Sequence, residues 1–274
     1  MTFKDILVHV DNTREARNRL RLAAGLARAH DGHLTALNVR GRPDLPPFIA
    51  DQFGPEIQEV QGRSQDAAAR EARVAFDAAV PTAGITTEWR DVDGTLAENL
   101  ILHARYADLT VVGQPEPGAD DPAPVAALAL EVGRPLLVVP FAGTFDTVGR
   151  RVVVAWNASR EATRAVHDAL PLLKTAEQVR VIAINPGRGM AGHGDVPGAD
   201  ICLHLSRHGV RAVCEHVASD DLNAGAMLLS RVADEDADML VMGAYGRSRL
   251  REMVLGGATR HILRHMTVPV LLSH

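Results

Sequence analysis

The sequence is short of several features that define whole classes of protein. It has two cysteines, Cys202 and Cys214, too few and too close for a disulfide framework and not spaced as C-x-x-C. We expect both to be simply buried, in a protein of a reducing compartment. No apolar run approaches the ~20 residues of a membrane span. Residues 1–5 lead into an expected strand without a signal-peptide pattern, which favours a cytoplasmic protein.

Positive charge and the common nucleotide and nucleophile motifs are also missing. The chain has 29 lysines and arginines against 34 aspartates and glutamates, a formal net charge of −5. The sequence has no basic stripe, so we expect no nucleic-acid partner. The absence of G-x-x-x-x-G-K-[ST] excludes a Walker-type ATPase. Ser159 lacks a surrounding G-x-S-x-G, and we interpret it as a helix cap rather than a nucleophile.

What the sequence does contain is an internal repeat. At 274 residues the chain exceeds the usual ~100–150-residue domain. Four segments of the first half recur in the same order in the second half, and the first pair aligns without a gap. The pairs are 6–15 with 152–161, 34–38 with 181–185, 107–113 with 237–243, and the strands that begin at Pro135 and Pro269. The repeat predicts two copies of one unit. We place the domains at 1–143 and 147–274, with residues 141–149 at the boundary.

Within each copy, short apolar strands alternate with amphipathic helices. This alternation predicts an α/β fold with parallel strands and helices on both faces of the sheet. The strands are expected near 5–10, 33–39, 85–91, 108–113 and 135–140, and near 151–156, 179–184, 210–217, 238–243 and 268–273. Residues 40–55, with four prolines and two glycines, and residues 185–200 are expected to be long irregular loops.

The candidate ligand site follows the fourth strand of the second copy. Ligands of open parallel sheets bind beyond the carboxyl ends of the strands. That strand runs into Gly243 and Gly246, and Gly256–Thr259 open a helix. Glycines permit close approach of backbone to a ligand, and a helix N-terminus favours a phosphate, which Arg247 or the nearby Arg249 and Arg251 would also contact. Taken alone, the pattern favours a simple tight turn followed by a helix start over a phosphate site.

The spacing Gly243-x-x-Gly246-x9-Gly256, before a final Val-Pro-Val strand, resembles the ATP-binding signature of the universal stress protein family. The likeness, tandem form included, covers essentially the whole chain. It implies two flavodoxin-like (Rossmann-like) five-stranded sheets with strand order 3-2-1-4-5, and ATP or a similar nucleotide, with or without Mg²⁺. The resemblance assigns Gly243 to the ribose, Ala155, Asn157 and Ile184 to the nucleoside, and Gly246, Gly256, Gly257, Ala258 and Thr259 to the phosphates.

The chain departs from the family pattern in three places. Gly257 stands where the family has Ser or Thr, and Thr259 is the nearest hydroxyl that replaces it. Asn157 stands where the family has an acidic residue, and its amide still forms hydrogen bonds without a charge. In the first copy Asp11 is kept, but residues 114–122 carry prolines and carboxylates instead of glycines. We expect the first copy to bind no nucleotide.

Other signals are set aside. Residues 187–192 match G-x-G-x-x-G, but more glycines and a proline follow, so we expect a loop rather than a dinucleotide site. The histidine pairs His204/His208 and His261/His265 have a chelating spacing without a third ligand, and no metal site is expected. Trp156 is expected to pack at a strand end rather than stack on a base.

The sequence therefore predicts a nucleotide-binding protein of stress adaptation or regulation, with no catalytic residue assigned. Two alternatives stay open: a slow ATP hydrolase or phosphotransferase in which Arg247 or Arg249 polarises phosphate, and an interaction protein without nucleotide. In the family, separate chains pair through their last strands. We expect residues 135–140 and 268–273 to pair antiparallel as an intrachain pseudo-dimer, and a further homodimer stays open.

Overall fold

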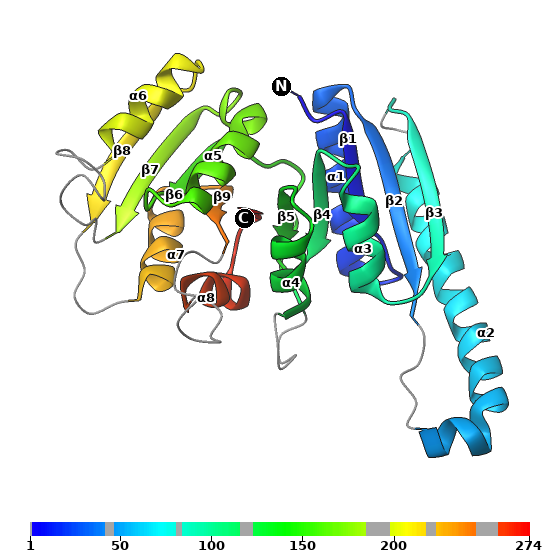
Figure 1. Cartoon of the computed structure of the whole chain (residues 1–274). Coiled ribbons are helices and arrows are strands. Elements are labelled where there is room, and N and C mark those ends of the chain that lie inside the picture. Colours follow the sequence, from blue (N-terminus) through cyan, green and yellow to red (C-terminus); the bar gives the residue numbers. More distant parts are fainter. Residues whose placement is uncertain are drawn as a thin grey trace.

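The computed structural model describes residues 2–41, 47–80, 84–115, 123–184, 198–217, 223–244 and 257–274, without the side chains of 47–58, 123, 124 and 126. Each half alternates strands and helices, as the sequence predicts (Figure 1). The N-terminal half comprises β1 (Asp5–His9), α1 (Arg14–His30), β2 (His33–Arg40), α2 (Pro47–Ala79), β3 (Thr87–Asp93), α3 (Leu96–Ala104), β4 (Leu109–Gly113), α4 (Ala123–Glu131) and β5 (Leu136–Val139). The C-terminal half comprises β6 (Arg151–Ala155), α5 (Arg160–Leu173), β7 (Gln178–Ile184), α6 (Ala199–Arg207), β8 (Ala212–Val217), α7 (Ala224–Asp234), β9 (Met239–Gly243), α8 (Gly257–His265) and β10 (Val270–Ser273).

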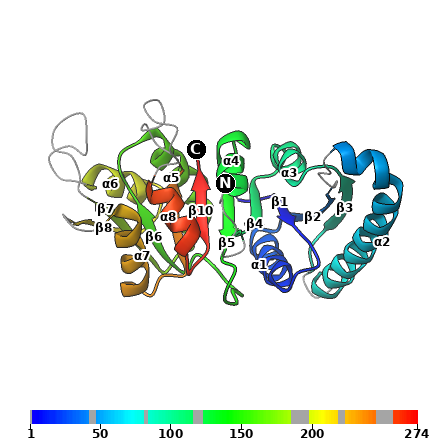
Figure 2. The ribbon, with the colours of Figure 1, turned by 90° about the horizontal axis from the view of Figure 1, so that it is seen from below.

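The strands form one ten-stranded sheet in the order β3-β2-β1-β4-β5-β10-β9-β6-β7-β8. Strands within each half are parallel, in the order 3-2-1-4-5 that the resemblance implies. The halves meet where β5 and β10 run antiparallel, with Leu137 opposite Leu271. Figure 2 shows these two strands side by side at the centre of the molecule. The expected pairing of the last strands is therefore present.

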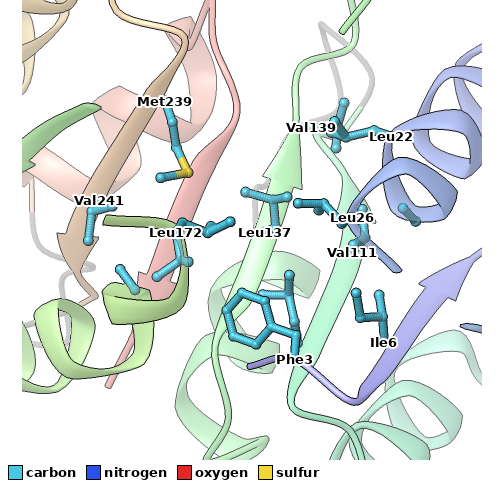
Figure 3. Close-up of a cluster of buried hydrophobic side chains, with 14 of the residues drawn as sticks. Phe3, Ile6, Leu22, Leu26, Val111, Leu137, Val139, Leu172, Met239 and Val241 are labelled. Atoms are coloured by element: carbon cyan, nitrogen blue, oxygen red, sulfur yellow. The ribbon is translucent and has the colours of Figure 1, made fainter. Parts of the chain in front are cut away.

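The hydrophobic core continues across the β5–β10 junction. One cluster of buried side chains joins α1, α2, α5 and α6 on one face of the sheet, and a second joins α3, α4, α7 and α8 on the other. In Figure 3, Leu137 of β5 lies between Leu26 of α1 and Leu172 of α5. Leu137 and Leu271 are both fully buried. The two halves thus share core side chains as one folded body.

The same local devices recur in both halves. Thr13 and Ser159 are the N-caps of α1 and α5, and each hydroxyl accepts a hydrogen bond from the backbone N–H three residues on. Asp108 accepts from the backbone N–H groups that start β1, and Asp238 accepts from those that lead into β6. The capping role predicted for Ser159 is confirmed, and the repeat extends to individual hydrogen bonds.

Two expectations are wrong. Residues 47–55 belong to α2 rather than to a loop; Pro47 stands at the first helical position, where its missing N–H costs nothing. Figure 1 shows α2 extending past the sheet. Cys202 and Cys214 form a disulfide, because α6 packs directly on β8 and brings their Cα atoms to 6.3 Å. None of the described helices is long and apolar enough to cross a membrane.

Candidate functional site

The strand register brings several predicted site residues to one edge of the sheet. Ala155 is paired with Ile182, so Ile184 at the end of β7 is level with Asn157. Val154 is paired with Val241, which puts Gly243 level with Trp156. Trp156 packs against the core, as expected, while Asn157 is exposed and accepts a hydrogen bond from the N–H of Ser159 at 3.1 Å. The residues that the sequence analysis assigns to the nucleoside thus share the carboxyl edge of β6, β7 and β9.

Gly243 is in direct contact with the first turn of α5. A methyl group on Gly243 would lie 2.5 Å from the backbone nitrogen of Ala162 and 2.8 Å from Cβ of Glu161. Only a residue without Cβ permits this approach. The absence of a side chain at Gly243 therefore sets how closely α5 approaches the end of β9.

Helix N-termini converge on the same edge, and they differ in charge. The first turn of α5 carries Glu161, which is 5% exposed. Burial alone would raise the pKa of Glu161, but its own backbone N–H and the Ser159 hydroxyl hold the pKa below its usual value. The first turns of α7 and α8 contain no acidic residue. An anion is accordingly favoured at α7 and α8 over α5.

The first turn of α8 offers three features to an anion. It lies against the start of α7, since a methyl group on Gly225 would meet the carbonyl oxygen of Ala258 at 3.0 Å. Gly257 is exposed, and a Cβ there would meet nothing within 4 Å. Arg260 has a buried Nε without a hydrogen-bond partner among the described residues, and long helical side chains lean toward the helix N-terminus. Sequence reasoning missed Arg260, although it directly follows the glycine signature.

The remaining predicted phosphate residues are placed differently. Thr259 is 4% exposed, so its side chain faces the protein interior rather than the exposed start of α8. Gly246, Arg247 and Gly256 lie outside the described residues, as does the segment 187–192.

In the N-terminal half, Gly113 is the counterpart of Gly243, and the side chain of Arg19 fills the space beside it. A methyl group on Gly113 would lie 2.5 Å from Nη1 of Arg19. Arg19 is paired with Asp11 at 2.9 Å, and its Nε donates to the carbonyl oxygen of His9 at 3.3 Å. Burial, reinforced by the Arg19 guanidinium, lowers the pKa of His9 to about 4, so His9 is neutral at pH 7. Continuing the ungapped alignment of the two copies places Ala165 where Arg19 stands, a signal available in the sequence.

Gln114, directly after Gly113, joins the two halves. Its Nε2 donates to the carbonyl oxygens of Leu263 and Arg264 at the end of α8, at 2.9 and 3.3 Å. Its Oε1 accepts from the backbone N–H of Phe141 at 2.9 Å. The first residue after β4 in this half is therefore used for a contact with α8 in the other half.

The histidine pair on α6 has a third neighbour. The ring of His167 on α5 lies 5.0 Å from His204 and 6.3 Å from His208, between ring centroids. Burial, with His208 and His167 nearby, lowers the pKa of His204. Even so, no group of three or more His, Cys, Asp or Glu side chains in the described part of the chain is arranged to hold a metal ion.

Comparison with known proteins places this geometry in a family. The model of the universal stress protein family matches residues 2–121 and 149–274, and the chain belongs to that family. A universal stress protein from Archaeoglobus fulgidus DSM 4304 is similar over 98% of this chain and 96% of its own, with a TM-score of 0.69 and 17% identity. A putative universal stress protein from Pseudomonas aeruginosa UCBPP-PA14 is similar over 99% of this chain and 93% of its own, with a TM-score of 0.60 and 15% identity. Universal stress protein Slr1230 of Synechocystis is 47% identical over 38 residues, 14% of this chain and 13% of that protein.

The space around Gly257 yields a first prediction. Gly257→Ser should keep nucleotide affinity or tighten it by up to about fivefold, as expected for one added hydrogen bond of ~1 kcal/mol, because the new Cβ meets nothing within 4 Å. Isothermal titration with ATP measures the change, with Gly257→Ala as the control that adds Cβ without a hydroxyl. A fall in affinity for serine but not for alanine would contradict the expected hydrogen bond from the added hydroxyl to the phosphates.

Proposed function

We propose that the C-terminal half, residues 147–274, binds ATP or a related nucleotide at the carboxyl edge of β6, β7 and β9, and that the protein acts in stress adaptation or regulation in the cytoplasm. The observation that carries the proposal is the meeting of two helix N-termini at this edge. The first turns of α7 and α8 lie together and, as far as the structure describes them, contain no acidic residue, and the described part of the chain holds no hydrogen-bond partner for the buried Nε of Arg260. Such an arrangement suits a polyphosphate.

The nucleoside would lie at the strand ends beside the phosphates. Ala155 and Ile184 are half-buried and supply apolar contacts, and Asn157 is exposed with its side-chain amide able to bind a ribose hydroxyl. Gly243 would contact the ribose through its backbone, since the space of its missing side chain is taken by the first turn of α5. Gly246, Arg247, Gly256 and Gly257 would hold the phosphates together with the backbone of Ala258 and Thr259, and Mg²⁺ would neutralise part of the phosphate charge.

The N-terminal half, residues 1–143, would bind no nucleotide. Its Asp11 carboxylate and His9 carbonyl already accept hydrogen bonds from Arg19, whose side chain is 7% exposed. A nucleotide would have to displace this ion pair, in which Arg19 is buried and Asp11 half-buried, and the buried Arg19 charge would be left uncompensated. The N-terminal half would instead support the C-terminal half structurally, since its Gln114 contacts α8.

The second prediction follows from this asymmetry: the full chain should bind one nucleotide. Isothermal titration with ATP measures the stoichiometry, and native mass spectrometry of freshly purified protein shows whether a nucleotide travels with it. Gly246→Val should abolish binding and leave the circular dichroism spectrum unchanged, because a side chain there blocks the phosphates. Two equivalent sites, or unchanged affinity in folded Gly246→Val, would overturn the assignment.

A further inference from the structure

The disulfide joins the outermost strand of the C-terminal half to its covering helix. Cys202 lies on α6 and Cys214 on β8, and the Cα–Cα distance of 6.3 Å falls within the range of ~4.4–6.8 Å that disulfides span. They are the only cysteines of the chain. The fold itself therefore holds the two side chains in position to bond without any movement of the backbone.

The disulfide is only partly enclosed. β8 is an end strand of the sheet, and both cysteines are half-buried and pack against the edge of the core. Cysteine oxidation and disulfide exchange require that a sulfur be reached by its reaction partner. A fully buried bond would be inert, whereas both side chains of this bond keep some contact with solvent.

The backbone positions also accommodate two thiols, because rotation of the two side chains is enough to separate the sulfurs. In the oxidised protein the carbonyl oxygen of Gly198 lies 2.9 Å from Sγ of Cys214, and that of Ala212 lies 3.8 Å from Sγ of Cys202. Backbone acceptors are therefore near both sulfurs. Ile201 and Leu205 hold α6 on the core whatever the state of the sulfurs, because they are 7% and 0% exposed.

We propose that Cys202 and Cys214 are a reversible thiol–disulfide site, oxidised by hydroperoxides and reduced by low-molecular-weight thiols. One thiolate attacks the peroxide, cleaves its O–O bond and becomes a sulfenic acid, with release of an alcohol or water. The second thiol then displaces water from the sulfenic sulfur and forms the S–S bond. Overall, two thiols lose two electrons and two protons, which the peroxide accepts. Two equivalents of a small thiol reverse the reaction through a mixed disulfide.

The proposal for the cysteine pair does not rest on the proposed nucleotide site. Forming the disulfide is expected to affect only the part of the fold around α6 and β8. The bond fixes α6 to β8, an edge strand that otherwise pairs only with β7. Hydrogen exchange in β8 should accordingly be slower in the oxidised protein than in the reduced one, because local opening of the edge requires separation from α6.

The test uses full-length protein, reduced, freed of reductant and treated with stoichiometric hydrogen peroxide. Maleimide trapping and intact-mass measurement should show two labelled thiols per chain before peroxide and none after it. Glutathione should restore both without denaturant, and the far-UV circular dichroism spectrum should be the same in both states. Cys202→Ser should instead accumulate sulfenic or sulfinic acid or a glutathione adduct on Cys214, with Cys214→Ser as its mirror control.

Three results would overturn the proposal. Labelling that stays at two thiols after peroxide would show that the bond does not form. Disulfide-linked dimers in place of an intrachain bond would show that the two sulfurs prefer other chains. A bond that glutathione reduces only in denaturant would be a permanent structural crosslink.

Discussion

Residues 147–274 expressed alone will form homodimers or aggregates instead of monomers. In the full chain β10 lies between β9 and β5, and Leu271 of β10 is fully buried opposite Leu137. Without β5, one edge of β10 and the apolar side chains along it are open to any strand of similar shape. A second copy of the fragment offers the same β10, which would pair antiparallel by the same rule. Light scattering after size exclusion gives the mass.

Two controls make the result specific. The full chain, measured at the same concentration, retains its own β5 and should not show the fragment's self-association through β10. Leu271→Lys in the fragment should shift it toward monomer, because a charged residue on an edge strand opposes pairing. A wild-type fragment that stays monomeric and folded would contradict the role given to β5.

Gly243→Ala will destabilise the protein by at least about 2 kcal/mol, at the upper end of what one extra methyl group costs in a packed interior. The new Cβ would lie 2.5 Å from backbone atoms of α5, which cannot turn aside as a side-chain tip can. Strand β9 or helix α5 must therefore move, and the carboxyl edge of β6 and β9 moves with them. Urea unfolding followed by circular dichroism measures the loss.

Gly257→Ala is the matched control, because the same methyl group there meets nothing within 4 Å. Gly257 is the first and an exposed residue of α8, where substitutions have small effects, so this variant should be about as stable as the wild type. An equal, small effect of both substitutions would show that α5 does not constrain Gly243 as described.

The fold was predictable because the repeat supplies each argument twice. Segments 6–15 and 152–161 share an apolar run, a cap and an Arg-Glu pair, and each segment becomes a strand followed by a capped helix. The start of α2 was not predictable in the same way, since prolines are common both in loops and in first helical turns. Pro47 takes the second role.

The candidate site was predictable only in part. The strand ends follow from the register, so Ala155, Ile184 and Gly243 reach one edge as expected. Sequence spacing does not show which side chains meet from different elements. The disulfide between Cys202 and Cys214 and the ion pair between Arg19 and Asp11 both depend on how a helix packs on a strand. The inward direction of the Thr259 side chain likewise depends on the packing of α8.

Because β5 and β10 belong to one chain, their antiparallel pairing does not depend on the concentration of the protein. A pair of separate chains dissociates as the protein becomes scarce, but here the half that carries β10 is attached to the half that carries β5 by the short segment between β5 and β6. Short connections hold linked groups at an effective concentration on the order of millimolar, whatever the number of molecules in the cell. The state of this junction is thus insensitive to expression level, and a cell that makes a few copies of the chain obtains the same paired sheet as one that makes many.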